Sequence, residues 1–471
     1  MGSEMCIRDR YTGEGESSPS VLVTSVINIF PNIRELKLRD IDEIDRIESR
    51  ESAFEYMAEH FTDNTVFSAS LKESLKNDNR YKAVKMLADN DDINLKNERL
   101  SVDLFGRDMY LSASRMEDYF NCSFRYFCKY GLLAKPRTAV KMDAMQTGTV
   151  IHYVLESILS DVGSKTLSQM KREDINNLVN KYLNKYLSAE IINGDSLSKR
   201  FIYQFTRLSN MITSVVNRIA EEFSQSDFEA KAFELDIDKD GAVKPALINL
   251  ENGGTVSLKG SIDRVDVLEK NGVKFVRVVD YKSGSKMFSL SDILYGLNLQ
   301  MFVYLFTLCN DKNCEYSGIP AGVLYMHSSK SVLTSNKNIA KENVSKNEDS
   351  EFKMKGIVLY DENHNILESM EHDLKGRYIP VKINKDGDVI GAFASLEELG
   401  RIEKKTEALI ALMGNNLHKG YINQNPINGK NHDKTCEYCD YSSVCANRKM
   451  IEKREMQEYG DKEVIEILKE E

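Results

Sequence analysis

The feature that most constrains the fold is a pair of β-rich runs on either side of Asn271-Gly272. Asn-Gly is well suited to a two-residue type I′ turn, in which both central residues take positive φ. The two runs are rich in β-branched and aromatic residues, namely Val265, Val267, Val273, Phe275, Val276, Val278 and Val279. The stretch 260–304 therefore predicts an antiparallel hairpin around which the rest of the chain is organised.

Two acidic residues face each other in this predicted hairpin. If Asn271 and Gly272 form the turn, counting outward along both strands sets Asp263 opposite Asp280. Directly opposed side chains lie about 4.5–5.5 Å apart at Cβ, where like charges destabilise a pair. Lys282 follows Asp280 by two residues and so returns to the same face. A charged, solvated hairpin surface is one interpretation, and a divalent cation between the carboxylates is the other.

Four motifs bear on the choice between a solvated hairpin surface and a cation site. They are Gly260-x-Ile262-Asp263-Arg264, Asp280-Tyr281-Lys282-Ser283, Gln300-x-x-x-Tyr304, and a helical segment at 148–156 that carries His152. Together they resemble the RecB-like branch of the PD-(D/E)xK nuclease superfamily. A lone histidine in an amphipathic helix is more often a packed core residue, and here the resemblance favours a metal ligand. The implied fold is α/β, a restriction-endonuclease-like core with a central mixed sheet flanked by helices.

The resemblance also implies a reaction, the metal-dependent hydrolysis of DNA phosphodiester bonds. The implied ligands of Mg²⁺ are His152, Asp263, Asp280 and a backbone carbonyl at Tyr281. Mg²⁺ prefers oxygen ligands and retains several waters, so such a site leaves room for a phosphate and an attacking water. The implied catalytic residues are Asp263, Asp280, Lys282, Gln300 and Tyr304. Lys282 would orient the water or stabilise charge, and the last two would position this lysine and the DNA.

A second candidate site is the cysteine motif Cys436-x-x-Cys439-x5-Cys445. This spacing indicates metal or cluster ligation, and the fourth ligand could be a distant cysteine, a local histidine or solvent. Cys122 and Cys128 lie upstream in an aromatic-rich helical segment. Six positions apart on a helix, they cannot share one face, so at most one of them points at any given site. Ser114 and Glu117 predict a capping box for this segment.

A distant cysteine followed by this C-terminal triplet resembles the split iron–sulfur staple of the B subunits of AddAB-type helicase–nucleases. The resemblance implies that Cys122 is the fourth ligand and that the cofactor is a [4Fe–4S] cluster. It further implies an AddA-like helicase–nuclease partner and, as substrate, a single DNA strand from an unwound duplex end. The implied role is the processing of double-strand breaks for homologous recombination.

The remainder of the 471-residue chain is assigned around these sites. Residues 1–18 are expected to be disordered or artefactual, 19–110 to be a helical connector to a missing helicase-like region, 111–450 to form the nuclease domain, and 451–471 to be a helical tail. Helices are expected at 43–62, 66–77, 79–89, 148–160, 168–192, 197–226, 291–308 and 395–413. Strands are expected at 320–326 and on both sides of Asp386-Gly387, and 328–352 is expected to be a disordered insertion.

Composition limits the class of protein. The net charge of −10 argues against a uniformly basic nucleic-acid-binding surface, so contacts to DNA must come from local basic patches or from a metal. No run approaches the roughly 18 apolar residues of a membrane helix, and a cytoplasmic location is expected. In that compartment, eight cysteines favour ligation over disulfides.

Three alternatives stay open. A catalytically silent DNA-binding module should have lost Asp263, Asp280 or Lys282, and all three are present. A stand-alone RecB-like or Cas4-like iron–sulfur nuclease would carry the same motifs, although the long helical segment at 160–230 and the connector fit the AddAB-type B subunit better. Zinc could replace the cluster, because cysteine spacing alone does not separate the two.

Overall fold

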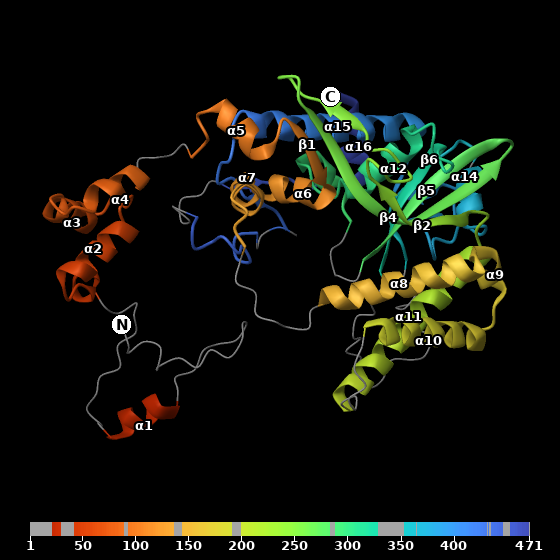
Figure 1. Cartoon of the computed structure of the whole chain (residues 1–471), viewed down its shortest axis with the longest axis horizontal. Helices are drawn as coiled ribbons and strands as arrows, with labels where there is room; N and C mark the ends of the chain where they lie inside the picture. Colours follow the sequence, from red (N-terminus) through yellow and green to blue (C-terminus); the bar gives the residue numbers. More distant parts are fainter. Residues whose placement is uncertain are drawn as a thin grey trace. The chain divides into compact units, whose positions relative to one another are not determined.

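The computed structural model of the chain describes residues 21–29, 42–88, 93–135, 144–190, 199–282, 288–327, 353–363, 365–430, 432, 435–445 and 453–470. The disorder expected at 1–18 and at 328–352 lies outside these residues. The chain forms two compact units, Met1–Asp91 and Asp92–Glu471 (Figure 1). No helix in the described part of the chain is both long and apolar enough to cross a membrane.

The first unit is helical in its described residues. Its elements are α1 (Val21–Ile29), η2 (Glu43–Arg46), α2 (Arg50–Glu59), α3 (Val66–Leu75) and α4 (Tyr81–Ala88). Ser49 begins α2 with a capping box to Ser52, and Thr65 caps α3. Phe54, Met57 and Leu75 form a small core between these helices. The helix expected at 43–62 is divided into η2 and α2, and the helices expected at 66–77 and 79–89 are the slightly shorter α3 and α4.

The second unit is built on a mixed sheet in the order β1-β4-β5-β6-β7-β10, with β2 and β3 also paired to β4. The strands are β1 (Asp108–Ser112), β2 (Glu229–Ile237), β3 (Leu247–Asn249), β4 (Thr255–Lys270), β5 (Val273–Lys282), β6 (Ile319–His327), β7 (Lys355–Leu359) and β10 (Phe393–Ala394). Pairs β1–β4, β5–β6 and β7–β10 are parallel, and the others are antiparallel. The expected α/β fold with a mixed sheet is confirmed.

The predicted hairpin is β4–β5. Lys270 pairs with Val273, and Asn271 and Gly272 form the turn with φ of 55° and 77°, as a type I′ turn requires. β4 is long enough to pair with two sets of neighbouring strands. Its first half pairs with β1 and β3, and its second half pairs with β2 and β5. The hairpin therefore lies at the centre of the sheet rather than at an edge.

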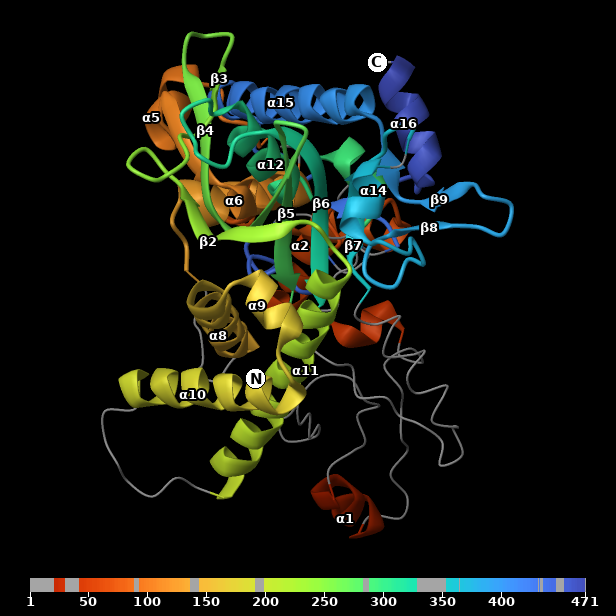
Figure 2. The ribbon, with the colours of Figure 1, turned by 90° about the vertical axis from the view of Figure 1, so that its right-hand side faces the viewer.

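Helices cover both faces of this sheet (Figure 2). One face is covered by α6 (Ala113–Asn121), α12 (Gln300–Asn310) and α15 (Leu396–His418), and α5 (Glu98–Phe105) packs on α15. The opposite side carries a helical layer made of α8 (Ala144–Val162), α9 (Ser164–Gln169), α10 (Arg172–Glu190) and α11 (Lys199–Ser224). α5 and β1 also belong to this compact unit, which begins at Asp92.

The smaller elements of the second unit are α7 (Ser123–Tyr126), η3 (Phe127–Gly131), η4 (Leu290–Tyr295), α14 (Asn365–Met370), β8 (Val381–Ile383), β9 (Val389–Gly391), β11 (Ile427–Asn428), β12 (Arg454–Glu455) and α16 (Asp461–Glu470). β8 and β9 are the two strands expected around Asp386-Gly387. α16 packs on α15 and η4, so the expected C-terminal helical tail is docked on this unit.

Two local expectations were wrong. α6 begins at Ala113, directly after β1, so Ser114 and Glu117 lie inside the helix and form no capping box. The single helix expected at 291–308 is two elements, η4 and α12. The break follows from the left-handed residues Gly296 (φ 83°) and Asn298 (φ 54°), a conformation that a continuous helix does not accommodate.

Candidate active site

The two predicted carboxylates lie at the ends of the paired strands. The register of β4 with β5 runs to Arg264 opposite Val279, and continuing it by one residue sets Asp263 opposite Asp280. Asp263 Oδ2 accepts a hydrogen bond of 2.7 Å from the backbone N–H of Tyr281. Burial and the neighbouring Asp280 raise the pKa of Asp263 to about 7. Two neighbouring acids shielded from solvent retain a proton near neutral pH unless a cation neutralises their negative charge.

His152 is brought to the same point by α8. Its Nε2 lies 3.1 Å from the Tyr281 carbonyl oxygen and its Nδ1 lies 3.6 Å from Asp263 Oδ1. Burial lowers the pKa of His152, but the hydrogen bond to Glu234, the charge of Asp263 and the Tyr281 carbonyl raise it to about 9. Both ring nitrogens face acceptors, which suits a protonated imidazole when no metal is bound. The side chain thus faces the acids and not the core.

Glu234 is a member of this group that the sequence did not reveal. Its Oε1 lies 3.2 Å from His152 Nδ1, and its Oε2 accepts a hydrogen bond of 3.2 Å from the Ser261 hydroxyl. Its neighbours in β2 pair with the neighbours of Asp263 in β4. Glu234 also has a φ of 44°, which is unusual for a residue other than glycine in a strand. Glu234 is one of three acids within residues 228–237, so the sequence did not single it out, and its strand partner could not be read from the sequence.

This donor set fits a divalent cation. His152, Glu234 and Asp263 each offer one ligand atom, and these atoms all lie within 4.8 Å of one another. Asp280 is 4% exposed, and its Oδ2 makes no hydrogen bond among the described residues, although Lys282 Nζ lies 2.8 Å away. Carboxylates combined with one imidazole are ligands that suit Mg²⁺ or Mn²⁺ better than a softer metal.

The predicted residues of α12 lie beside this group. Gln300 Nε2 is 3.5 Å from the hydroxyl of Tyr304, so the two side chains share one face as predicted. Tyr304 is buried against β4 at Gly260, where an added Cβ would come within 1.9 Å of the tyrosine hydroxyl. Glycine at 260 is therefore required by close packing. Burial and the nearby carboxylates of Asp280 and Asp263 raise the pKa of the Tyr304 hydroxyl to about 12, so this hydroxyl lies close to the acids.

We expect a divalent cation to stabilise the protein more at about pH 8 than at about pH 6. The folded-state pKa values of Asp263 and His152, about 7 and about 9, lie above their unfolded values of about 3.9 and 6.5. Without metal, the stability that these groups contribute is greatest at low pH and is lost as pH rises through 7 and 9. A cation competes with those protons, so its effect grows with pH.

Thermal unfolding at both pH values, with and without Mg²⁺, measures this difference. Asp263→Asn is the control, because it removes the group that titrates near 7 and one proposed ligand. An increase in Tm with Mg²⁺ that is equal at the two pH values, or that is unchanged in Asp263→Asn, would contradict the prediction.

The cysteine motif forms a second cluster in the described residues. Cys122, Cys436, Cys439 and Cys445 line one small pocket. Cys122 ends α6 in an extended conformation, and the next residue fastens that turn to the C-terminal segment. The Ser123 hydroxyl donates to the Asn423 carbonyl at 2.9 Å, and the Ser123 N–H donates to Asn425 Oδ1 at 3.1 Å.

The other two candidates for the fourth ligand do not line this pocket. Cys128 is buried and does not line the pocket. The local histidine, His432, has its Nε2 3.6 Å from Asp292 Oδ2 of η4 and is not a lining residue. Among these described candidates, Cys122 is the one that lines the pocket with Cys436, Cys439 and Cys445. Cys128 lies close behind it, because burial, Cys439 and Cys122 raise the pKa of the Cys128 thiol to about 11.

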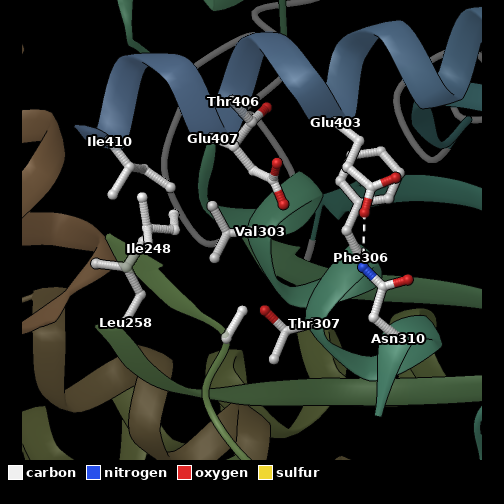
Figure 3. Close-up of a pocket in the computed structure, with 11 residues that line it drawn as sticks. Ile248, Leu258, Val303, Phe306, Thr307, Asn310, Glu403, Thr406, Glu407 and Ile410 are labelled. Atoms are coloured by element: carbon white, nitrogen blue, oxygen red, sulfur yellow. Dashed lines mark hydrogen bonds between the residues drawn. The ribbon is translucent and has the colours of Figure 1, made fainter. Parts of the chain in front are cut away.

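A separate cavity of about 30 Å³ lies between α12 and α15 (Figure 3). Ile248, Leu258 and Val303 give it an aliphatic wall, and Glu403 at its rim accepts a hydrogen bond of 2.7 Å from Asn310. It shares no lining residue with either cluster, and its volume holds little more than one water molecule.

The mixed sheet, the hairpin acids and the lysine beside them define the class of protein. The chain belongs to the PD-(D/E)XK nuclease superfamily, whose model matches residues 110–446. Nucleases of this superfamily typically use a divalent metal ion.

Three relatives make the resemblance more specific. The chain is similar to proteins named as the B subunits of ATP-dependent helicase/deoxyribonucleases. That of Clostridium tetani is 30% identical over 96% of this chain and 41% of its own length. The protein of Clostridium botulinum strain Hall is 29% identical over 92% of this chain and 40% of its own length. The protein of Ruminiclostridium cellulolyticum is 33% identical over 73% of this chain and 30% of its own length. The chain thus spans well under half the length of these relatives, and the resemblance to such B subunits is confirmed.

Proposed function

We propose that the chain is the nuclease part of a helicase–nuclease complex and hydrolyses DNA phosphodiester bonds with Mg²⁺. The observation that carries the proposal is that His152, Glu234 and Asp263 offer three ligand atoms within 4.8 Å of one another, beside the Tyr281 carbonyl and the Asp280–Lys282 ion pair. The names of the relatives, each a deoxyribonuclease component, supply DNA as the substrate.

In this proposal His152, Asp263, Asp280 and the Tyr281 carbonyl hold the ion, and Glu234 adds a further carboxylate. A bound Mg²⁺ would lower the pKa of a water and withdraw charge from the phosphate. Burial lowers the pKa of Lys282, but Asp280 raises it above its usual value, so the ammonium stays charged. A charged lysine cannot act as a base, and its role is to orient the attacking water and to stabilise the negative charge that develops.

We further propose a [4Fe–4S] cluster on Cys122, Cys436, Cys439 and Cys445. Tetrahedral zinc with bonds of about 2.3 Å would hold its sulfur atoms about 3.8 Å apart. No three described cysteine sulfur atoms lie within 4.8 Å of one another. A cuboidal cluster binds each thiolate to a different iron and so spreads the four sulfurs more widely. We propose the cluster because the cysteine pattern resembles the split iron–sulfur staple, and the metal content of the protein decides between iron and zinc.

The partners follow from the same relatives. We propose that residues 19–110 connect the nuclease domain, 111–450, to a helicase-like region, and that an AddA-like subunit feeds it one strand of an unwound duplex end. The role would be double-strand-break processing for recombination in the cytoplasm. Support comes from the relatives' names, which describe one component of an ATP-dependent helicase/deoxyribonuclease, and from the greater length of those proteins.

The direct test is cleavage of end-labelled single-stranded DNA by the anaerobically purified chain, with Mg²⁺ or with EDTA. We expect Mg²⁺-dependent shortening of the strand, together with about four irons per chain and visible absorbance. Binding of DNA without cleavage would overturn the nuclease proposal in favour of a silent binding module. Zinc in place of iron would overturn the cluster.

A further inference from the structure

A buried network of four charged residues lies on the reverse face of the hairpin. Strand alternation places Arg264 and Asp266 of β4, and Arg277 of β5, on the side opposite Asp263 and Asp280. Arg264 Nη2 and Arg277 Nε each donate to Asp266 Oδ2 at 2.8 Å. The next partner comes from the helical layer.

Glu222 of α11 joins the network from the far side. Its Oε1 accepts bonds from Arg264 Nη2 at 3.1 Å and from Arg277 Nη2 at 2.5 Å. The charges of the two arginines and the two acids balance, and none of the four side chains is exposed. Arg264 lies 4.8 Å from the ring centroid of Phe223, so the aromatic residue next to Glu222 also contacts the network.

Such a network adds little to stability for its size. Removing charges from water is costly, and an apolar group of similar volume is often as stable. Arg264 Nε, Asp266 Oδ1 and Arg277 Nη1 also have no hydrogen-bond partner among the described residues, which adds to that cost. What the network does provide is a fixed geometry, because each charge is held by directional bonds to at least two others.

Tyr281 connects this network to the candidate metal site. Arg264 Nη1 donates to the Tyr281 hydroxyl at 3.3 Å. The backbone of the same tyrosine contacts both halves of the site, since its N–H donates to Asp263 and its carbonyl accepts from His152. Glu222 meanwhile anchors α11, which packs on the helix α8 that carries His152 (Figure 2).

We infer that Glu222, Arg264, Asp266 and Arg277 are positioning residues for metal binding. They fix the Tyr281 peptide and hold the helical layer with His152 at its distance from the two strand carboxylates. The inference rests on the proposed metal site and deepens it. The network touches neither metal nor DNA and acts only through the placement of His152 and Tyr281.

The test is Mn²⁺ binding to the whole chain by isothermal titration calorimetry. Glu222→Gln keeps the shape of the side chain but removes its charge, and we expect Mn²⁺ affinity to fall about tenfold or more, as for other residues that support metal ligands. Arg218→Gln is the matched control. Arg218 is a buried residue of the same helix whose Nη2 donates to the Arg377 carbonyl, away from the hairpin. It should lower Tm and leave Mn²⁺ affinity unchanged.

Tyr281→Phe keeps the test valid should Glu222→Gln fail to fold, because it removes only the hydroxyl that Arg264 contacts. We expect a several-fold loss of Mn²⁺ affinity. Affinity equal to the parent in either folded variant, or an equal loss in Arg218→Gln, would overturn the positioning role and leave the metal site standing. A parent chain that binds no Mn²⁺ would instead overturn the proposed function, and this inference with it.

Discussion

Replacement of Asp280 by alanine should reduce cleavage of single-stranded DNA at least about a hundredfold while the protein remains folded. The change removes a proposed metal ligand and the acid that lies 2.8 Å from Lys282 Nζ. It also frees Asp263 from a like-charged neighbour that raises its pKa, so the folded state should lose little stability. Initial rates in Mg²⁺ and a thermal unfolding curve measure the two effects separately.

Glu371→Gln is a matched control for the loss of a buried carboxylate. Glu371 is 2% exposed and accepts hydrogen bonds from the backbone N–H groups of Arg377, Tyr378 and Ile379, away from the hairpin. This variant should lose stability and keep its cleavage rate, the reverse of Asp280→Ala. If Asp280→Ala cleaves within about tenfold of the parent rate, the metal-site assignment is wrong.

Replacement of His152 by alanine tests the same metal site through a different ligand. If the histidine supplements two carboxylates, its loss should be milder than that of Asp280 and should raise the Mg²⁺ concentration needed for half-maximal cleavage. A Mg²⁺ dependence identical to that of the parent would show that His152 holds no metal.

The part of the site that local rules govern could be predicted from the sequence. The Asn271-Gly272 turn sets the register of the hairpin, and a strand period of two then places Asp263, Asp280 and Lys282 on one face. A helical period likewise puts Gln300 and Tyr304 together. Each of these relations involves a few residues within one element or one hairpin.

The parts that were missed depend on pairings between distant segments. Glu234 enters the site because β2 pairs with β4 in one particular register. Glu222 meets Arg264 and Arg277 because α11 packs on the reverse face of the hairpin. Neither contact follows from periodicity, because a strand or helix pattern says which face is buried and not what covers it. The break at Gly296 shows the same limit, since a left-handed residue interrupts an apolar pattern that otherwise reads as one helix.

Cys122→Ser should remove the cluster and destabilise the second unit, whereas Cys128→Ser should do neither. Cys122 lines the pocket with Cys436, Cys439 and Cys445, and Cys128 is buried outside it. A cluster on these four thiolates links the end of α6 to the C-terminal segment and so closes a very long loop. Loop-closure entropy grows slowly with length, but a covalent link of this span should still contribute on the order of 5 kcal/mol.

Iron content and thermal unfolding of the two serine variants, purified anaerobically side by side, decide between the assignments. Both substitutions replace a cysteine sulfur by a hydroxyl in neighbouring turns, so a difference in iron cannot come from the chemistry of the replacement. Loss of iron in Cys128→Ser with retention in Cys122→Ser would reverse the residue assignment. Retention in both would show that Cys436, Cys439 and Cys445 find their fourth ligand locally, and His432 would then be the residue to replace, although it lies 3.6 Å from Asp292 in this structure. The contact between His432 and Asp292 joins the cysteine segment to η4, which lies between Lys282 and Gln300 in the chain. Replacing His432 would therefore also disturb the active site, and cleavage should fall together with the iron content.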